Sequence, residues 1–276
     1  MAIAMEKIDC AKEVSSFFIE NEPYYLPQGK EVELCEKAFY FKLPILLKGP
    51  TGCGKTRFME YMAWRLKRPL FTISCHDDLS TSDLVGRYLI KGGETVWMDG
   101  PLTMAVKHGG ICYLDEIVEA RKDTTVVIHP LADDRRKLPI EKKGQIIQAP
   151  DQFMLAISYN PGYQSVLKDL KPSTRQRFIA IDFGYPDEDR EVKIVAHEAK
   201  IETDLAQSLV RLGRMTRNLK DQGLQEGAST RLLIHAGKLI GSGIDPSLSC
   251  ETAICQPLTD DPEILNGLME MIRAVF

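Results

Sequence analysis

Short apolar runs alternate with segments of helical periodicity over the first two thirds of the chain. Compact apolar runs typical of buried strands lie at residues 43–47, 70–74, 110–115, 153–158 and 178–183. Between them, residues 28–40 and 57–66 carry apolar side chains at helical spacing. Because strands separated by helical segments form parallel sheets covered on both faces, the pattern predicts an α/β fold with a parallel five-stranded sheet flanked by helices.

The last third of the chain has a different pattern, since strand signals stop after Pro186. Helical stripes follow near residues 187–200, 203–222, 229–241 and 261–275, which predicts a small C-terminal domain made only of helices. Near the other end, Pro23 and Pro27 exclude regular helix. The predicted domains are therefore an N-terminal arm at 1–22, an α/β core at 23–185 and a helical lid at 186–276.

Two hairpins are predicted as insertions within the α/β core. The strand-like residues 88–97 are interrupted by a Gly92-Gly93 turn, and residues 136–147 form a second pair around Lys143-Gly144. Loops of this kind often contact partners, and a surface hairpin without a partner fits the pattern equally well.

Composition and charge limit the classes of partner. The 276 residues carry a formal net charge of −4, which excludes attraction of the whole surface to nucleic acid or to an anionic membrane. No stretch is apolar for the ~18 to 20 residues that a membrane span needs, and the start lacks a secretory signal, so we expect a cytoplasmic protein. The seven cysteines lack metal-type spacing and predict neither disulfides nor a zinc site.

A complete phosphate-binding motif lies between the first apolar strand and a helix. Its residues are Gly49, Pro50, Thr51, Gly52, Cys53, Gly54, Lys55 and Thr56, which match the pattern GxxxxGK[ST]. The glycines let backbone amides turn towards phosphate oxygens, Lys55 supplies a positive charge, and the Thr56 hydroxyl can bind magnesium. In this context a chance match to a glycine-rich turn is disfavoured, and the motif predicts binding of ATP with Mg²⁺.

Two acidic residues follow the third predicted strand. The apolar run 111–114 leads to Asp115, which is placed to bind magnesium, and Glu116, which is placed to activate the attacking water. Two acids at the end of a strand commonly serve only as a helix cap. Because a complete phosphate-binding loop lies about 60 residues upstream, the pair instead predicts hydrolysis as well as binding.

Four further polar residues are candidates on weaker grounds. Asn160 follows the fourth strand and could hold water or phosphate, although Asn before Pro is also ordinary turn chemistry. Arg175 and Arg177 lie at the entrance to the fifth strand, where they could reach a phosphate across a subunit boundary or remain solvated charges. Arg231 lies in the first turn of a helix that Ser229 could cap, an unfavourable place for a cation unless an anion is near.

With these motifs in order, the chain resembles the MoxR branch of the AAA+ ATPases, and most closely its CbbQ/NorQ group. The matching segments are 23–25, 49–58, 75–79, 99–102, 113–116, 158–164 and 170–178. The resemblance implies that Asn160 is the sensor 1 residue, that Arg175 and Arg177 are arginine-finger candidates, and that Arg231 is the sensor 2 residue. It also implies that the hairpin at 88–97 is the helix 2 insert and that the hairpin at 136–147 is the pre-sensor 1 hairpin.

The same resemblance implies partners and clients. Members assemble as homohexameric rings and commonly work with a von Willebrand factor A adaptor. CbbQ-like members resemble rubisco activases that release inhibitory sugar phosphates, whereas NorQ-like members support nitric oxide reductase. Residues 138–144 look CbbQ-like and residues 92–97 also occur in the NorQ style, so rubisco is the expected client and nitric oxide reductase the alternative. A DNA-associated AAA+ factor and a scaffold that binds ATP without turnover remain further alternatives, disfavoured by the acidic balance and by Glu116 respectively.

Overall fold

The computed structural model describes residues 14–161, 170–220 and 223–276 of the chain. These residues form two compact units. The first comprises Met1–Gly49 with Lys55–Phe183, and the second comprises Pro50–Gly54 with Gly184–Phe276. The predictions for residues 1–13 and for the motif residues 162–164 lie outside the described part. The linear division at residues 22 and 185 stays a prediction.

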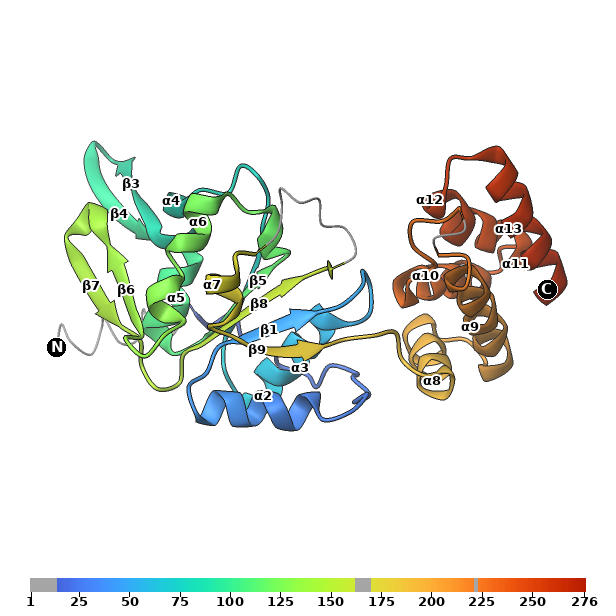
Figure 1. The fold of residues 1–276 in the computed structure, drawn as a ribbon, viewed down its shortest axis with the longest axis horizontal. Coiled ribbons are helices and arrows are strands. Elements are labelled where there is room, and N and C mark those ends of the chain that lie inside the picture. Colours follow the sequence, from blue (N-terminus) through green and yellow to red (C-terminus); the bar gives the residue numbers. More distant parts are fainter. Residues whose placement is uncertain (1–13, 162–169, 221–222) are drawn as a thin grey trace. The chain divides into compact units, whose positions relative to one another are not determined.

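The first unit is built on a five-stranded sheet (Figure 1). Its strands are β1 (Ile45–Lys48), β2 (Leu70–Ser74), β5 (Ile111–Asp115), β8 (Met154–Tyr159) and β9 (Ile179–Asp182). They lie in the order β2-β5-β8-β1-β9, and every neighbouring pair is parallel. The predicted parallel five-stranded sheet is confirmed. Its carboxyl ends meet at one edge, which is where open α/β sheets bind ligands.

Helices cover both faces of this sheet (Figure 1). One side carries α2 (Glu31–Tyr40) and α3 (Lys55–Leu66), and the other carries α5 (Pro101–His108). Shorter helices are α4 (Thr81–Val85), α6 (Lys122–Val126) and α7 (Pro172–Arg175), with 3₁₀ turns at Ile117–Glu119, His129–Leu131 and Glu141–Lys143. The predicted helices at 28–40 and 57–66 are confirmed, the first beginning three residues later than expected.

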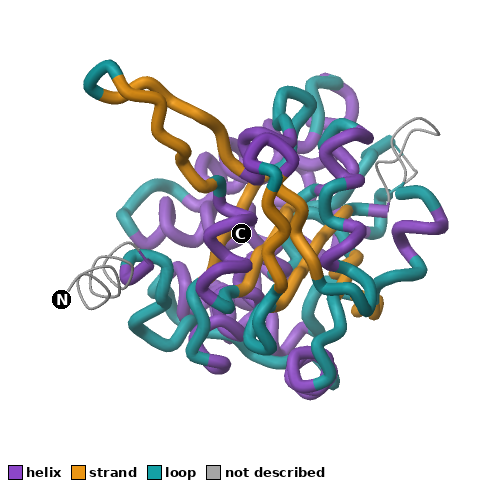
Figure 2. Tube along the Cα trace, turned by 90° about the vertical axis from the view of Figure 1, so that its left-hand side faces the viewer, coloured by secondary structure: helices purple, strands orange, loops and turns teal. Residues whose placement is uncertain are grey.

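Both predicted hairpins are present. Strands β3 (Gly86–Lys91) and β4 (Glu94–Asp99) pair around Gly92-Gly93, and β6 (Lys137–Ile140) pairs with β7 (Gln145–Gln148). The hairpin β3–β4 extends away from the rest of the first unit (Figure 2). The two hairpins touch where the Lys143 ammonium lies 5.4 Å from the centre of the Trp97 ring.

The second unit is helical in its described residues after Gly184. Its helices α8 (Glu188–Ala199), α9 (Thr203–Arg217), α10 (Thr230–Gly241) and α13 (Pro262–Val275) confirm the four predicted ones, although α9 ends five residues early. The structure adds α11 (Pro246–Cys250), a π-helical turn (Glu251–Cys255) and α12 (Gln256–Leu258). No helix of the described residues has the length and apolar composition to cross a bilayer.

Candidate active site

The phosphate-binding loop connects β1 to the first residue of α3. A Cβ added to Gly49 would lie 2.3 Å from the carbonyl oxygen of Phe183, so only glycine fits this close approach. Gly54 has φ +102°, a conformation that disfavours other residues. The side chain of Lys55 is buried, and its Nζ donates hydrogen bonds to the carbonyl oxygen of Gly49 at 2.8 Å and to Oδ1 of Asn160 at 2.7 Å. These contacts fix the Lys55 ammonium beside the start of the loop and the end of β8.

Asp115 ends strand β5 and is held through both of its carboxylate oxygens. Oδ1 accepts hydrogen bonds from the hydroxyl of Tyr113 at 2.8 Å and from the hydroxyl of Ser158. Oδ2 accepts one from Oγ1 of Thr56 at 3.3 Å. Asp115 and Thr56 thus meet at the carboxyl edge of the sheet, beside the amino end of α3, although 59 residues separate them in the chain.

Glu116 adopts a strained backbone conformation directly after the strand. Its φ of 55° and ψ of 48° are left-handed, which is uncommon for a residue with a side chain and is found where the surrounding structure imposes it. Its amide donates to Oγ of Ser158 at 3.2 Å, and its Oε1 accepts from Nδ2 of Asn160 at 3.4 Å. The structure therefore joins Lys55, Asn160 and Glu116 in one hydrogen-bonded chain.

Two residues of this site were missed by the sequence analysis. Tyr113 and Ser158 are both fully buried, and both bind the carboxylate of Asp115. A signal for Tyr113 existed, because side chains two apart on a strand share a face and the polar hydroxyl interrupts an apolar run. Ser158 could have been found in the same way, two residues before Asn160.

The two arginines lie at the opposite end of the sheet from the phosphate-binding loop. Strand β9 runs parallel to β1, with Ile179 opposite Ile45, so residues that precede β9 lie at the amino ends of the strands. Arg175 is exposed, and Arg177 is half-buried with its Nη1 donating to the carbonyl oxygen of Ser173. The structure does not place either arginine beside Lys55 of its own chain.

His129 connects the segment after Glu116 to this arginine-bearing helix. Its Nε2 lies 3.0 Å from Oγ1 of Thr174, at hydrogen-bonding distance. Burial lowers the pKa of the imidazole, and the positive charge of Arg177 lowers it further. The contact therefore gives this histidine a structural role, in which it ties the segment after Glu116 to α7.

Arg231, the candidate residue in the helical part of the second unit, is exposed in the first turn of α10. Ser229 occupies the N-cap position as predicted, although its side chain makes no capping hydrogen bond. Within this unit, a Cβ on Gly52 would lie 2.7 Å from Cβ of Ser229, so the loop segment 50–54 reaches the start of α10. The hydroxyl of Tyr185 donates to the carbonyl oxygen of Thr51 at 3.3 Å.

A buried ion pair supports the same end of α10. Nη1 and Nη2 of Arg217 bind Oε2 and Oε1 of Glu191 at 2.8 and 2.7 Å, and the Glu191 side chain is fully buried. The hydroxyl of Thr230, the first residue of α10, also donates to Glu191 at 2.6 Å. The Arg217 guanidinium stacks on the Tyr185 ring, 3.8 Å from its centre.

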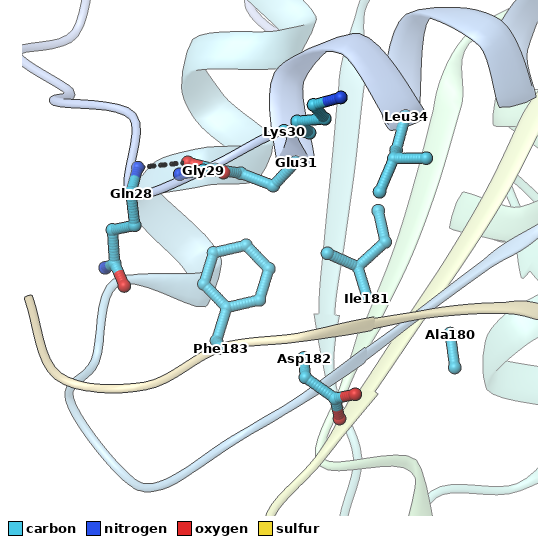
Figure 3. Close-up of a pocket in the computed structure, with 9 residues that line it drawn as sticks. All are labelled: Gln28, Gly29, Lys30, Glu31, Leu34, Ala180, Ile181, Asp182 and Phe183. Atoms are coloured by element: carbon cyan, nitrogen blue, oxygen red, sulfur yellow. Dashed lines mark hydrogen bonds between the residues drawn. The ribbon is translucent and has the colours of Figure 1, made fainter.

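A cavity of about 440 Å³ opens beside the edge strand β9 and the start of α2 (Figure 3). Glu31 is one of its lining residues. The Glu31 carboxylate already accepts hydrogen bonds from the hydroxyl of Tyr25 and from the amides of Gln28 and Gly29, at 2.6 to 2.7 Å. Phe183 forms another part of the lining. No residue of 49–56 and neither Asp115 nor Glu116 lines this cavity, so the catalytic candidates lie elsewhere.

Two family models match most of the chain. The model described as AAA domain (dynein-related subfamily) matches residues 44–178, and the model described as CbbQ/NirQ/NorQ C-terminal matches residues 191–275. Protein NorQ of Paracoccus denitrificans is 59% identical over 93% of this chain and 95% of its own length. The chain belongs to the CbbQ/NirQ/NorQ family of AAA ATPases. The resemblance noted from the sequence motifs is confirmed.

Other members of the CbbQ/NirQ/NorQ family are almost as similar. The denitrification regulatory protein NirQ of Pseudomonas aeruginosa is 57% identical over 91% of this chain and 96% of its own. Protein CbbQ of Hydrogenophilus thermoluteolus is 52% identical over 95% and 98%. A solved structure of a RuvB mutant from Thermotoga maritima has the same fold, with a TM-score of 0.57, 18% identity, and coverage of 92% of this chain and 73% of that one.

Family membership makes the protein an ATPase that binds its nucleotide with Mg²⁺. The described side chains fit this ion, because Thr56 and Asp115 offer a hydroxyl and a carboxylate, and oxygen ligands are those that magnesium prefers.

Proposed function

We propose that this protein couples ATP hydrolysis in a homohexameric ring to the remodelling of a client protein, and that residues 49–56, Asp115, Glu116 and Asn160 form its catalytic site. The observation that supports the proposal is the hydrogen-bonded chain from Lys55 through Asn160 to Glu116. It joins a phosphate-binding cation to a carboxylate that can act as a base. Such geometry suits phosphoryl transfer to water, in which positioning and charge stabilisation dominate.

The proposed site divides into residues that bind the phosphates, residues that hold magnesium and residues that act on the attacking water. The amides of residues 49–54 and the ammonium of Lys55 bind the phosphates, and Thr56 and Asp115 hold the magnesium ion, which neutralises phosphate charge when bound. The Glu116 carboxylate orients the attacking water and accepts its proton. The amide of Asn160 fixes Glu116 through Nδ2 and Lys55 through Oδ1.

Assembly into a ring completes the site. Because Arg175 and Arg177 precede β9, they lie at the far end of the sheet from their own loop, and we assign them to the ATP of a neighbouring subunit. Arg231 acts from the helical lid, residues 186–276, as the sensor of bound nucleotide. The region 23–185 is the ATPase core, and the hairpins β3–β4 and β6–β7 transmit the nucleotide state.

The sequence identities to the relatives rank the two candidate clients. The chain is 59% and 57% identical to NorQ and NirQ, against 52% to CbbQ. This order favours a client in denitrification, so the proposal reverses the ranking expected from the sequence and takes nitric oxide reductase as the first candidate. Rubisco, the client expected from the sequence, becomes the second candidate, supported by the CbbQ-like residues 138–144. In either case we propose a von Willebrand factor A adaptor that links the ring to its client.

Capture of partners by an ATP-trapped variant tests the client. Tagged Glu116→Gln protein, incubated with Mg-ATP in native extract, should retain adaptor and client, because the ring is held in its ATP state. Lys55→Ala protein is the matched control, since it should bind no nucleotide and retain neither partner. Enrichment of nitric oxide reductase subunits supports the first client. Enrichment of rubisco instead selects the second, and equal capture by both variants contradicts ATP-dependent remodelling.

A further inference from the structure

The phenol of Tyr113 lies in a buried strand position, where an apolar side chain would be sufficient for the fold. Tyr113 belongs to β5, the strand between β2 and β8, and is fully buried on the sheet face that α3 covers. A hydroxyl buried in such a strand is costly unless it forms a hydrogen bond. It donates a hydrogen bond to the carboxylate of Asp115 at 2.8 Å, and the hydroxyls of Ser158 and Thr56 are further hydrogen-bonding neighbours. Hydrogen bonds to ionised acceptors are the stronger class.

The two oxygens of Asp115 have different surroundings. Oδ1 receives both protein donors that come from the sheet, the hydroxyls of Tyr113 and Ser158. Oδ2 faces Oγ1 of Thr56, a residue of the phosphate-binding motif. The hydrogen bonds to Oδ1 therefore fix the rotation of the carboxylate about its Cβ–Cγ bond, and this leaves Oδ2 directed at Thr56.

We propose that Tyr113 is a positioning residue for the magnesium site: it holds Oδ1 of Asp115 so that Oδ2 is presented towards Thr56. The inference rests on the proposed role of Asp115 in holding magnesium. Ser158 shares the task and extends it, because the same hydroxyl also accepts the amide of Glu116 at 3.2 Å. Partners of this kind around a metal ligand typically change metal affinity by about 10- to 100-fold when they are removed.

The test removes one oxygen atom and has a matched control. Tyr113→Phe deletes the hydroxyl, and Tyr159→Phe makes the same change on the neighbouring strand β8, where alternation places the ring on the opposite face from Ser158. For both variants, binding of a fluorescent ATP analogue is titrated with Mg²⁺, and binding of Mn²⁺ to the nucleotide complex is followed by electron paramagnetic resonance. Thermal unfolding without nucleotide reports structural damage separately.

We expect Tyr113→Phe to raise the Mg²⁺ concentration for half-saturation about tenfold, while affinity for the analogue in EDTA stays at the wild-type value. Tyr159→Phe should leave both quantities unchanged. Ser158→Ala removes the second donor to the same oxygen and should also raise the Mg²⁺ requirement, which provides an independent variant if Tyr113→Phe folds poorly.

A wild-type Mg²⁺ requirement in Tyr113→Phe and Ser158→Ala, together with a raised one in Asp115→Asn, overturns the inference and leaves the proposed function intact. If Asp115→Asn also keeps the wild-type requirement, the proposed metal role of Asp115 is wrong, and the inference is lost with it. A lower melting temperature with unchanged Mg²⁺ dependence would show that the tyrosine is merely structural, which also overturns it.

Discussion

Nζ of Lys55 donates a hydrogen bond to Oδ1 of Asn160 at 2.7 Å, across 105 residues of chain. This bond connects the phosphate-binding loop to the end of strand β8. Because the other end of the same amide reaches Glu116, one side chain sets the geometry of both the phosphate-binding cation and the proposed base.

Asn160→Ala should therefore reduce turnover more than binding. Loss of the amide frees Glu116 to leave the line of attack, and we expect kcat to fall about 100-fold, the usual loss for one positioned polar group. The affinity for ATP should change little, because Lys55 keeps its hydrogen bond to the carbonyl oxygen of Gly49. Steady-state hydrolysis and equilibrium binding of a fluorescent analogue measure the two effects. A weaker affinity with unchanged kcat would assign Asn160 to binding instead.

Glu116→Gln should abolish hydrolysis and keep nucleotide binding. The amide is of similar size but cannot accept the proton of water, so kcat should fall by about 10²- to 10⁴-fold. Glu119→Gln, three residues further along, is the control and should retain turnover. Phosphate release and binding of the fluorescent analogue give the two readouts. Near-normal hydrolysis by Glu116→Gln would remove this residue from the mechanism.

The sequence predicted the sheet well because its inner strands β5, β8 and β1 are buried on both faces and form compact apolar runs. For the candidate site it predicted the residues that local motifs contain, 49–56 and Asp115, and the structure brings Thr56 and Asp115 of this set into contact. The contacts of Asp115 were not predictable with the same ease, because they depend on register. Leu114 of β5 lies opposite Ile157, and only this pairing brings Ser158 to the carboxylate of the neighbouring strand.

In the helical unit, the segment 246–258 could not be predicted from the sequence pattern. Pro246 and Pro257 interrupt the periodic pattern, and the helices there are three to five residues long, too short for an amphipathic repeat to appear. Their burial comes from the rest of the fold: Cys250, Ile254 and Cys255 are fully covered. The secondary structure of this segment therefore depends on tertiary packing, which a local sequence pattern does not reveal.

The ion pair between Arg217 and Glu191 should be essential for stability of the second unit. Arg217→Met leaves the fully buried Glu191 carboxylate without its cation, which should cost about 3 to 5 kcal/mol of unfolding free energy. The control is Arg214→Met on the same helix, whose partner Glu188 lies 3.5 Å away at the surface, and it should cost about 0 to 1 kcal/mol. Urea unfolding followed by helical circular dichroism compares them. Equal losses would contradict a special role for the buried pair.

Glu31 should make stability depend on pH. Burial opposes ionisation, but hydrogen bonds from Tyr25 and from the amides of Gln28 and Gly29 outweigh it and lower the pKa below the ordinary 4.5. A lowered folded pKa stabilises the folded state above pH 4.5, and this contribution is lost as the pH falls through the lower folded value.

Glu31→Gln should accordingly be less stable than the wild type at neutral pH by about 1 to 3 kcal/mol, the range for a lost charged hydrogen-bond acceptor. The difference should shrink below pH 4.5. Glu33→Gln, an exposed neighbour in the same helical turn, is the control and should show neither effect. Unfolding curves between pH 3 and 7, about the range set by carboxylate titration, provide the measurement. A gap that stays constant with pH would mean that the Glu31 charge contributes nothing.

The position of Arg175 and Arg177 at the amino end of β9 predicts that they act on a neighbour's ATP. The Arg175→Ala/Arg177→Ala variant keeps the phosphate-binding loop but lacks both arginine fingers. The Lys55→Ala variant keeps the arginine fingers but lacks a working phosphate-binding loop. A ring made of either variant alone should therefore be inactive. When the two are dissociated, mixed in equal amounts and reassembled, about one interface in four joins an intact loop to an intact finger. ATPase activity should therefore return to about a quarter of the wild-type value, and mixtures with the single variants then identify the acting arginine. Activity of the Arg175→Ala/Arg177→Ala ring alone would place the arginines outside the reaction. A mixture that stays inactive although native mass spectrometry shows mixed rings would contradict their action on a neighbour's ATP.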